Sequence, residues 1–252
     1  MSILIYYIYY KYTCPNMNGI LKQNFMGLWK KVTNDIKHVY SFEEIVGHDD
    51  IKQIFENAIF SKRPVHILLV GSPGSAKTMF LTEIMRHHKG SYFAVGSNTT
   101  KAGLVNQLFE RRPKFLLIDE LEKMSITDQT ALLHLMETGI VSETKINKTR
   151  QMEISLWVFA TANSCEKIIK PLLSRFAILE MPDYTFEEFS EIAVFKLRNE
   201  NVDESLARSI AEKVWNGLGS RDIRDVIKVS RLATNVQDID FVIRMLSFHP
   251  HL

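Results

Sequence analysis

The segment GSPGSAKT at residues 71–78 constrains this chain more than any other feature, because it stands between an apolar run and an amphipathic helical pattern. A glycine-containing turn can fold its backbone N–H groups around a phosphate, and the helix that follows points its positive end at the same anion. Lys77 would add a cation for the β- and γ-phosphates, and the Thr78 hydroxyl would be a Mg²⁺ ligand. We therefore expect ATP and Mg²⁺ as ligands.

Ala76 departs from the strict phosphate-loop pattern, which has glycine at this position. We expect the change to be harmless, because alanine suits a first helical residue with an ordinary negative φ. The residues expected to bind the nucleotide phosphates are Gly71, Ser72, Pro73, Gly74, Ser75, Ala76, Lys77 and Thr78.

A second motif, FLLIDE at residues 115–120, places two carboxylates directly after four apolar residues. The apolar residues predict a buried strand, and open α/β sheets bind ligands at the carboxyl ends of their strands. Asp119 would hold Mg²⁺ through water, and Glu120 would orient and deprotonate the water that attacks the γ-phosphate. The expected reaction is Mg-dependent ATP hydrolysis.

The first part of the chain alternates short apolar runs with helical patterns, which predicts a doubly wound α/β domain with a parallel five-stranded sheet. The runs lack polar alternation, as expected for strands that are covered on both faces. The predicted strands are residues 65–70, 92–95, 115–118, 156–160 and 177–181. Helices are predicted at residues 79–87 and 126–138, and Ser125 with Asp128 forms a candidate capping box before the second of them.

After residue 181 the strand signal ends and only helical patterns follow, which predicts a small all-helical lid domain. Thr185 and Glu188 form a second candidate capping box. Further helices are predicted at residues 204–216, ended by Gly217, and at residues 220–232 and 240–247. The expected domains are an N-terminal extension at 1–40, an α/β nucleotide-binding core at 41–181 and the lid at 182–252.

Composition excludes little. The formal net charge of +2 creates no global field that would require nucleic acid or a membrane as partner. Cys14 and Cys165 lie far apart and match neither a disulfide framework nor a zinc site, so we expect a cytoplasmic protein. The apolar run at residues 3–10 is shorter than the roughly 20 residues that span a bilayer. The extension is either disordered, upstream of the true start, or a docking segment.

With these motifs in order, the chain resembles the AAA+ P-loop ATPases over most of its length. The stretch before the first strand resembles the family's adenine-binding segment, so Ile45, Val46 and Gly47 are the implied base contacts. Asn163, which follows the fourth strand in ATAN, would be the sensor 1 residue that holds the γ-phosphate or the attacking water. Arg175, in PLLSRF, would be an arginine finger that acts on the nucleotide of the neighbouring subunit. This role implies a homo-oligomeric ring, which we predict to be a hexamer.

The segment GSRDIRD at residues 219–225 resembles the sensor 2 region at the start of a lid helix. Arg221 and Arg224 are both candidates for the arginine that reads the phosphates. The glycine–small–arginine pattern favours Arg221, and Arg224 would then be a solvated helix charge.

Three features resemble MCM helicases and MoxR-type ATPases: the alanine before Lys77, the METG segment at 136–139 and the SRF arginine segment at 174–176. A predicted hairpin with arms at 140–145 and 149–154 resembles the pre-sensor-1 hairpin, and the overall length and the YTFEEFSEIA stretch at 184–193 resemble the RuvB Holliday-junction motor. These resemblances place the chain in the hairpin-bearing branch, near RuvB and MCM. The implied function is RuvB-like remodelling of DNA, with Lys145, Lys148 and Arg150 as candidate phosphate contacts. A solvated hairpin tip would explain the same charges. The alternative function is MoxR-like remodelling of a protein partner through an adaptor.

Overall fold

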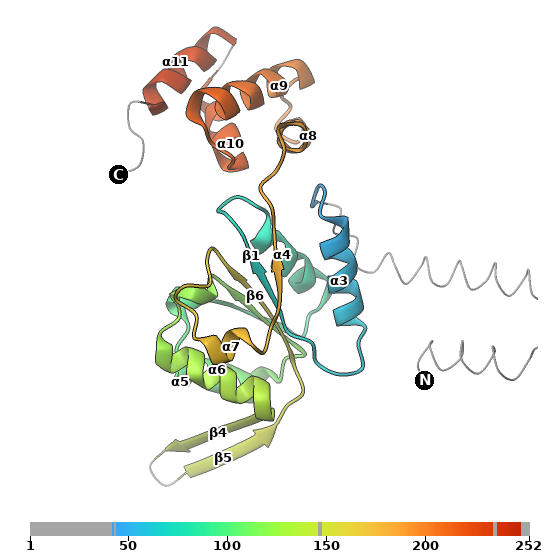
Figure 1. Cartoon of the computed structure of the whole chain (residues 1–252), viewed down its shortest axis with the longest axis vertical. Coiled ribbons are helices and arrows are strands. Elements are labelled where there is room, and N and C mark those ends of the chain that lie inside the picture. Colours follow the sequence, from blue (N-terminus) through green and yellow to red (C-terminus); the bar gives the residue numbers. More distant parts are fainter. Residues whose placement is uncertain (1–41, 43, 146–147, 234–235, 248–252) are drawn as a thin grey trace, which may run out of the picture. The chain divides into compact units, whose positions relative to one another are not determined.

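The computed structural model describes residues 42, 44–145, 148–233 and 236–247 (Figure 1). The predicted N-terminal extension lies outside the described residues. Within the described part, the predicted doubly wound α/β fold is confirmed: a five-stranded parallel sheet has the order β2-β3-β6-β1-β7. Its strands are β1 (Ile67–Val70), β2 (Ser91–Val95), β3 (Phe115–Asp119), β6 (Trp157–Ala162) and β7 (Ala177–Glu180). All five correspond to the apolar runs of the sequence.

Alternate residues of the strands face two separate layers of helices. On one face, Leu68, Leu116 and Val158 share a buried cluster with leucines of α5 (Lys101–Arg111) and α6 (Ile126–Thr138). On the other face, aromatic rings stack. Phe55 of α3 (Asp49–Ile59) lies 5.2 Å from both Phe80 and Phe159, measured between ring centroids. Because both faces of the central strands β1, β3 and β6 are covered, their side chains are almost all apolar, and this is why they read as continuous hydrophobic runs.

The helix α4 (Lys77–His87) follows the phosphate loop directly, and the short α7 (Lys170–Leu173) precedes β7. At the start of α6 the predicted capping box is only half formed. The Ser125 side chain accepts a hydrogen bond from the Asp128 backbone N–H, but the Asp128 carboxylate accepts from the Lys101 N–H at 2.6 Å. Asp128 therefore links the starts of α5 and α6 instead of closing the box.

A two-stranded antiparallel hairpin stands between α6 and β6, as predicted (Figure 1). Its strands are β4 (Ile140–Lys145) and β5 (Lys148–Glu153), and the register pairs Lys145 with Lys148 next to the tip. The second arm begins and ends one residue earlier than the pattern predicts. Gly139, with a φ of +66°, ends α6 and turns the chain into the hairpin.

Beyond β7 the described residues are helical and pack around a buried cluster of their own, which includes Phe189, Leu197, Ile210 and Val229. The helices are α8 (Phe186–Arg198), α9 (Glu204–Lys213), the π-helical turn η3 (Val214–Leu218), α10 (Ile223–Leu232) and α11 (Val236–Ser247). The Thr185–Glu188 capping box at the start of α8 is complete.

Three helix boundaries in this region were predicted wrongly. Gly217 does not end the second helix, because the chain continues through the π-helical turn to Gly219, whose φ is +63°. The third helix begins at Ile223 and not at residue 220, since the Asp222 side chain caps it by accepting from the Arg224 N–H. The last helix begins at Val236, four residues earlier than the pattern indicates. The residues before Asp222 are therefore free to take a non-helical path.

None of the helices in the described ranges combines the length and the apolar character that crossing a membrane requires.

Candidate nucleotide-binding site

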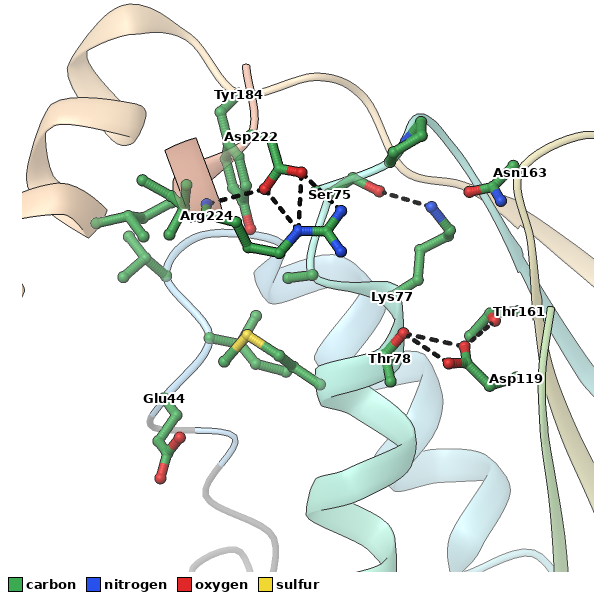
Figure 2. A pocket seen from close by; sticks show the side chains of 18 of the residues that line it. Glu44, Ser75, Lys77, Thr78, Asp119, Thr161, Asn163, Tyr184, Asp222 and Arg224 are labelled. Carbon is green, nitrogen blue, oxygen red and sulfur yellow. Dashed lines mark hydrogen bonds and ion pairs between the residues drawn. The ribbon is translucent and has the colours of Figure 1, made fainter. Parts of the chain in front are cut away.

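A cavity of about 440 Å³ opens where β1, β3 and β6 end (Figure 2). Its wall brings together the segments that the sequence singled out: the phosphate loop from Pro73 to Thr78, the Asp119–Glu120 edge and Asn163. The helical region adds Ile192, Asp222, Ile223 and Arg224, and the segment before it adds Tyr184. Gly71 and Ser72 of the loop do not line the cavity. The parallel sheet thus delivers the predicted motifs to one edge.

The phosphate loop turns through two left-handed residues. Gly74 has a φ of +87°, which glycine adopts freely. Ala76 has a φ of +62°, so the prediction of an ordinary φ at this position is wrong. An L-residue in this region costs roughly 1–2 kcal/mol. The Ala76 methyl group packs against the apolar cluster of the helical region, a contact that glycine lacks.

Lys77 is 7% exposed, and its ammonium group folds back onto the loop. Nζ donates to the carbonyl oxygens of Gly71 and Ser72 at 2.8 and 2.7 Å, and to the Ser75 hydroxyl at 3.3 Å. Burial lowers the pKa of Lys77, while the carboxylates of Glu122 and Asp119 act in the opposite direction. A triphosphate bound here would therefore meet a cation that has little competing solvent.

Thr78 and Asp119 lie side by side at the cavity wall and are joined by hydrogen bonds, as Figure 2 shows. The Thr78 hydroxyl lies 3.0 and 3.1 Å from the two carboxylate oxygens of Asp119. A hydroxyl and a carboxylate beside a phosphate site are the oxygen donors that Mg²⁺ takes in nucleotide-hydrolysing proteins, where substrate phosphates and water complete its shell. The donor set fits Mg²⁺, with Thr78 and Asp119 as the residues that would hold it.

Thr161, which is 1% exposed, connects the two acidic residues of the edge. Its hydroxyl donates to the Asp119 carboxylate at 2.5 Å and accepts from the Glu120 backbone N–H at 3.0 Å. One buried hydroxyl therefore fixes the carboxylate of the metal site and the backbone of the next residue together.

Glu120 is held in an unusual backbone conformation, with φ 56° and ψ 52°. A non-glycine residue in the left-handed region is strained and is often found at functional sites. Its side chain is 33% exposed and pairs with Lys123 at 2.7 Å. A Cβ at Gly96, at the end of β2, would lie 2.1 Å from the Glu120 carbonyl oxygen, so only glycine permits this approach.

Asn163 is bound to a residue that the motifs did not include. Its backbone N–H and its side-chain Nδ2 donate to the Oε1 atom of Glu122 at 3.1 and 2.8 Å. Glu122 is 9% exposed and does not line the cavity. Asn163 lies at the cavity wall, as the sensor 1 prediction requires, with a buried carboxylate behind it.

The apolar end of the cavity includes Ile45 and Val46, two of the three candidate base contacts. The third, Gly47, is not in the lining, and its φ of +71° places it in a turn before α3. Tyr184 stands at this end, and burial raises the pKa of its phenol to about 12. The phenol therefore keeps its proton and can act as a hydrogen-bond donor.

The two sensor 2 candidates are separated by the start of α10. Arg224 lines the cavity and pairs with Asp222 at 2.6 Å. Arg221 is not in the lining. Its guanidinium lies 3.4 Å from the ring centroid of Trp215 and donates to the Trp215 carbonyl oxygen at 3.1 Å. The geometry thus does not support the preference for Arg221, and Arg224 becomes the candidate.

Arg175 does not line the cavity of its own chain, in agreement with a role that reaches outward. It follows α7, and its guanidinium bonds the Glu137 carboxylate near the end of α6, with the Nε–Oε1 distance at 3.1 Å. The side chain is 45% exposed. A surface ion pair of this kind contributes little stability and can open to meet another partner.

Arg150 is the one candidate phosphate contact on the hairpin whose side chain the structure describes. It bonds Glu143 at 2.7 Å and Asn106 at 2.9 Å, and it lies over the Phe109 ring at 4.2 Å from the centroid. These contacts tie the hairpin to α5, so Arg150 is not a free cation. The side chains of Lys145 and Lys148 lie outside the described residues, so those two predictions stay open.

Thr161, Glu122 and Asp222 are polar residues at or directly behind the cavity wall that sequence reasoning missed. It also did not name Tyr184, Ile192 and Ile223 as lining residues. Thr161 stands inside the quoted ATAN segment, and its position on the same strand as Asn163 could have drawn attention to it. Glu122 follows the acidic pair by two residues and is one acid among many. Its partner is 41 residues away in the sequence, so no local spacing reveals the contact.

Comparisons with known proteins agree with this geometry. Residues 67–184 match the family described as "ATPase family associated with various cellular activities (AAA)". The minichromosome maintenance protein MCM of Saccharolobus solfataricus is 24% identical over 72% of this chain and 30% of its own length. Replication factor C small subunit 1 of Pyrobaculum aerophilum is 24% identical over 77% of this chain and 59% of its own length.

Among solved structures, the RuvB Holliday junction branch migration motor of Thermotoga maritima superposes with a TM-score of 0.61. Its sequence is 21% identical, and the match covers 82% of this chain and 72% of the RuvB chain. This likeness establishes the fold. The chain spans less than a third of the length of the MCM relatives that it matches, at 30% and 24%.

Proposed function

Because residues 67–184 of this chain form an AAA-family ATPase domain, we propose that the protein couples Mg-dependent ATP hydrolysis to the remodelling of DNA, in the manner of a RuvB-like branch-migration motor. The observation that carries the proposal is the β4–β5 hairpin, inserted between α6 and β6 in an ATPase core whose relatives are named as replication factors and as a branch-migration motor.

The proposed chemistry assigns a task to each side chain at the cavity. Lys77 holds the β- and γ-phosphates, Thr78 and Asp119 hold Mg²⁺, and Glu120 accepts the proton of the attacking water. Bound Mg²⁺ supplies charge neutralisation on the phosphate oxygens. Glu120 must leave Lys123 to do its work, and this exchange is available because both side chains are partly exposed.

Two arginines complete the proposed site, one from the same chain and one from a neighbouring subunit. Arg224 reads the phosphates from α10 of the same chain, so nucleotide turnover would change how residues 182–252, the proposed lid, engage the core. Arg175 acts on the nucleotide of the next subunit in a homo-oligomeric ring, which we take to be a hexamer. The support is that Arg175 lies away from its own cavity on a partly exposed surface.

DNA that binds at the hairpin is expected to raise the ATPase rate of the full chain. Duplex and branched DNA are added to the protein with Mg·ATP, and phosphate release is measured. Exchanging Lys145 and Lys148 for alanine together should abolish the stimulation and lower the slope of log affinity against log salt by about 2, because two phosphate contacts are lost. The basal rate without DNA should not change.

The matched control removes two exposed lysines away from the hairpin, Lys62→Ala with Lys89→Ala. This variant has the same net charge as the hairpin variant and should keep the stimulation. If both variants lost the DNA stimulation equally, the effect would come from net charge alone, and the hairpin would not be the DNA-binding element.

The second candidate function is remodelling of a protein partner through an adaptor. One observation favours it: Arg150 is tied to Glu143 and Asn106, so the hairpin offers fewer free cations than the sequence suggested. If neither duplex nor branched DNA changed the ATPase rate, the result would favour remodelling of a protein partner over remodelling of DNA.

A further inference from the structure

A buried acidic residue that the proposed chemistry does not use lies directly behind the site. Glu122 belongs to the 3₁₀ turn η2 (Leu121–Lys123), which follows Glu120. It is 9% exposed, and it is not part of the cavity wall. It is therefore neither a proton acceptor for the attacking water nor a ligand of the metal.

Within the described ranges, Asn163 supplies both hydrogen bonds that the Glu122 side chain accepts. The backbone N–H and Nδ2 of Asn163 converge on Oε1 of Glu122, at 3.1 and 2.8 Å. An ionised carboxylate can only accept hydrogen bonds, so it selects the nitrogen of the Asn163 amide and turns the carbonyl oxygen, Oδ1, away from itself. Figure 2 draws this amide oxygen on the side of Asn163 that faces Lys77.

The second carboxylate oxygen of Glu122 makes the arrangement costly. Oε2 is buried, and no group in the described part of the chain donates a hydrogen bond to it. A buried carboxylate with an incomplete set of hydrogen bonds is weak evidence for a stabilising role. Glu122 instead follows Glu120 by two residues, and its contact with Asn163 places its carboxylate directly behind the cavity wall. Its surroundings are thus those of the reaction centre.

We propose that Glu122 is a positioning residue for ATP hydrolysis: it locks the Asn163 amide so that Oδ1 is presented to the attacking water as a hydrogen-bond acceptor. Asn163 then orients the water together with Glu120, and it does not act by donating its amide nitrogen to the γ-phosphate. The inference deepens the proposed function, because it rests on the role proposed there for Asn163 at the hydrolysis site.

A polarity exchange between the two residues tests this orientation without truncating either side chain. Asn163→Asp alone places two carboxylates against each other and should lower kcat at least tenfold. Adding Glu122→Gln restores a donor–acceptor pair in the opposite sense, since the glutamine amide can donate to Asp at position 163. The second oxygen of that Asp remains an acceptor for the water. The kcat of the double variant should therefore be at least fivefold higher than that of Asn163→Asp alone.

The measurement is steady-state hydrolysis of Mg·ATP by the full chain without DNA, with kcat and KM determined for each variant. Glu122→Gln alone should lower kcat severalfold with KM nearly constant, because a glutamine amide can donate as well as accept and no longer selects Nδ2 of Asn163. Glu122→Ala should lower kcat tenfold to a hundredfold with KM nearly constant, and it should add nothing to the loss caused by Asn163→Ala.

Three results would overturn the inference: no recovery in the exchanged double variant, unchanged kcat in Glu122→Ala, or losses that multiply in the Glu122→Ala/Asn163→Ala pair. The first result is decisive even if the alanine variant does not fold, because the exchange keeps both side chains at nearly their original size. Failure of the DNA proposal is separate, since it would appear only as an absent response to DNA and would leave these basal rates as predicted.

Discussion

Replacing Glu120 by glutamine is expected to lower kcat for ATP hydrolysis by roughly 10²–10⁴-fold, because the site loses its proton acceptor and keeps its shape. Glutamine is almost isosteric with glutamate, and Lys77, Thr78 and Asp119 remain in place, so affinity for Mg·ATP should stay within about threefold. Both quantities can be measured on one preparation, hydrolysis by phosphate release and affinity with a fluorescent ATP analogue.

The matched control for this variant is Glu191→Gln, which removes the same charge from an exposed position on α8. It should retain full activity. If Glu120→Gln hydrolysed ATP at the wild-type rate, Glu120 would not be the proton acceptor for the attacking water. A variant that also lost nucleotide binding would place Glu120 in the binding site and not in the chemical step.

Replacing Arg175 by alanine is the second change with a large expected effect, a loss of roughly 10³–10⁵-fold in kcat if its guanidinium stabilises the transferring phosphoryl group. The control is Glu137→Gln, which removes the carboxylate partner of Arg175 but leaves the guanidinium intact. Because a surface ion pair contributes little, this control should hydrolyse ATP within about threefold of the unchanged rate.

Mixing subunits distinguishes action within a chain from action on a neighbour. Arg175→Ala subunits supply an intact Glu120, and Glu120→Gln subunits supply an intact Arg175, so a mixed ring contains some complete sites. We expect hydrolysis to recover when the two inactive variants are combined. A mixture that stays inactive at every ratio, while both variants still assemble, contradicts a finger shared between subunits.

The centre of the sheet was predictable from sequence because the strands β1, β3 and β6 are buried on both faces. A strand such as β3 (Phe115–Asp119) contains only apolar residues until it reaches the edge of the sheet, so the apolar run in the sequence marks where the strand begins and ends. The helix α5 (Lys101–Arg111) was not predicted, since only Leu104 and Leu108 are buried and Gly103 weakens the pattern. Partial burial leaves too few apolar positions to define a period.

The site was predictable where backbone geometry carries the function, and less so where side chains cross between elements. The phosphate loop and the acidic edge are local motifs. The choice between Arg221 and Arg224 depended on where α10 begins. Because Asp222 caps the helix, Arg221 precedes it, and the Arg221 guanidinium lies over the Trp215 ring. The left-handed φ of Ala76 was hidden for a similar reason, because its methyl group packs against a cluster formed by helices much later in the chain.

The central claim is that the loop around Lys77 and the edge at Asp119 and Glu120 together bind Mg·ATP. Isothermal titration of ATP into the full chain, with and without Mg²⁺, tests it most directly when the same titration is run on Lys77→Ala. We predict saturable binding that Mg²⁺ strengthens and that Lys77→Ala abolishes. Binding of equal strength in Lys77→Ala, or no heat of binding to the unchanged chain in excess Mg²⁺, would contradict the account.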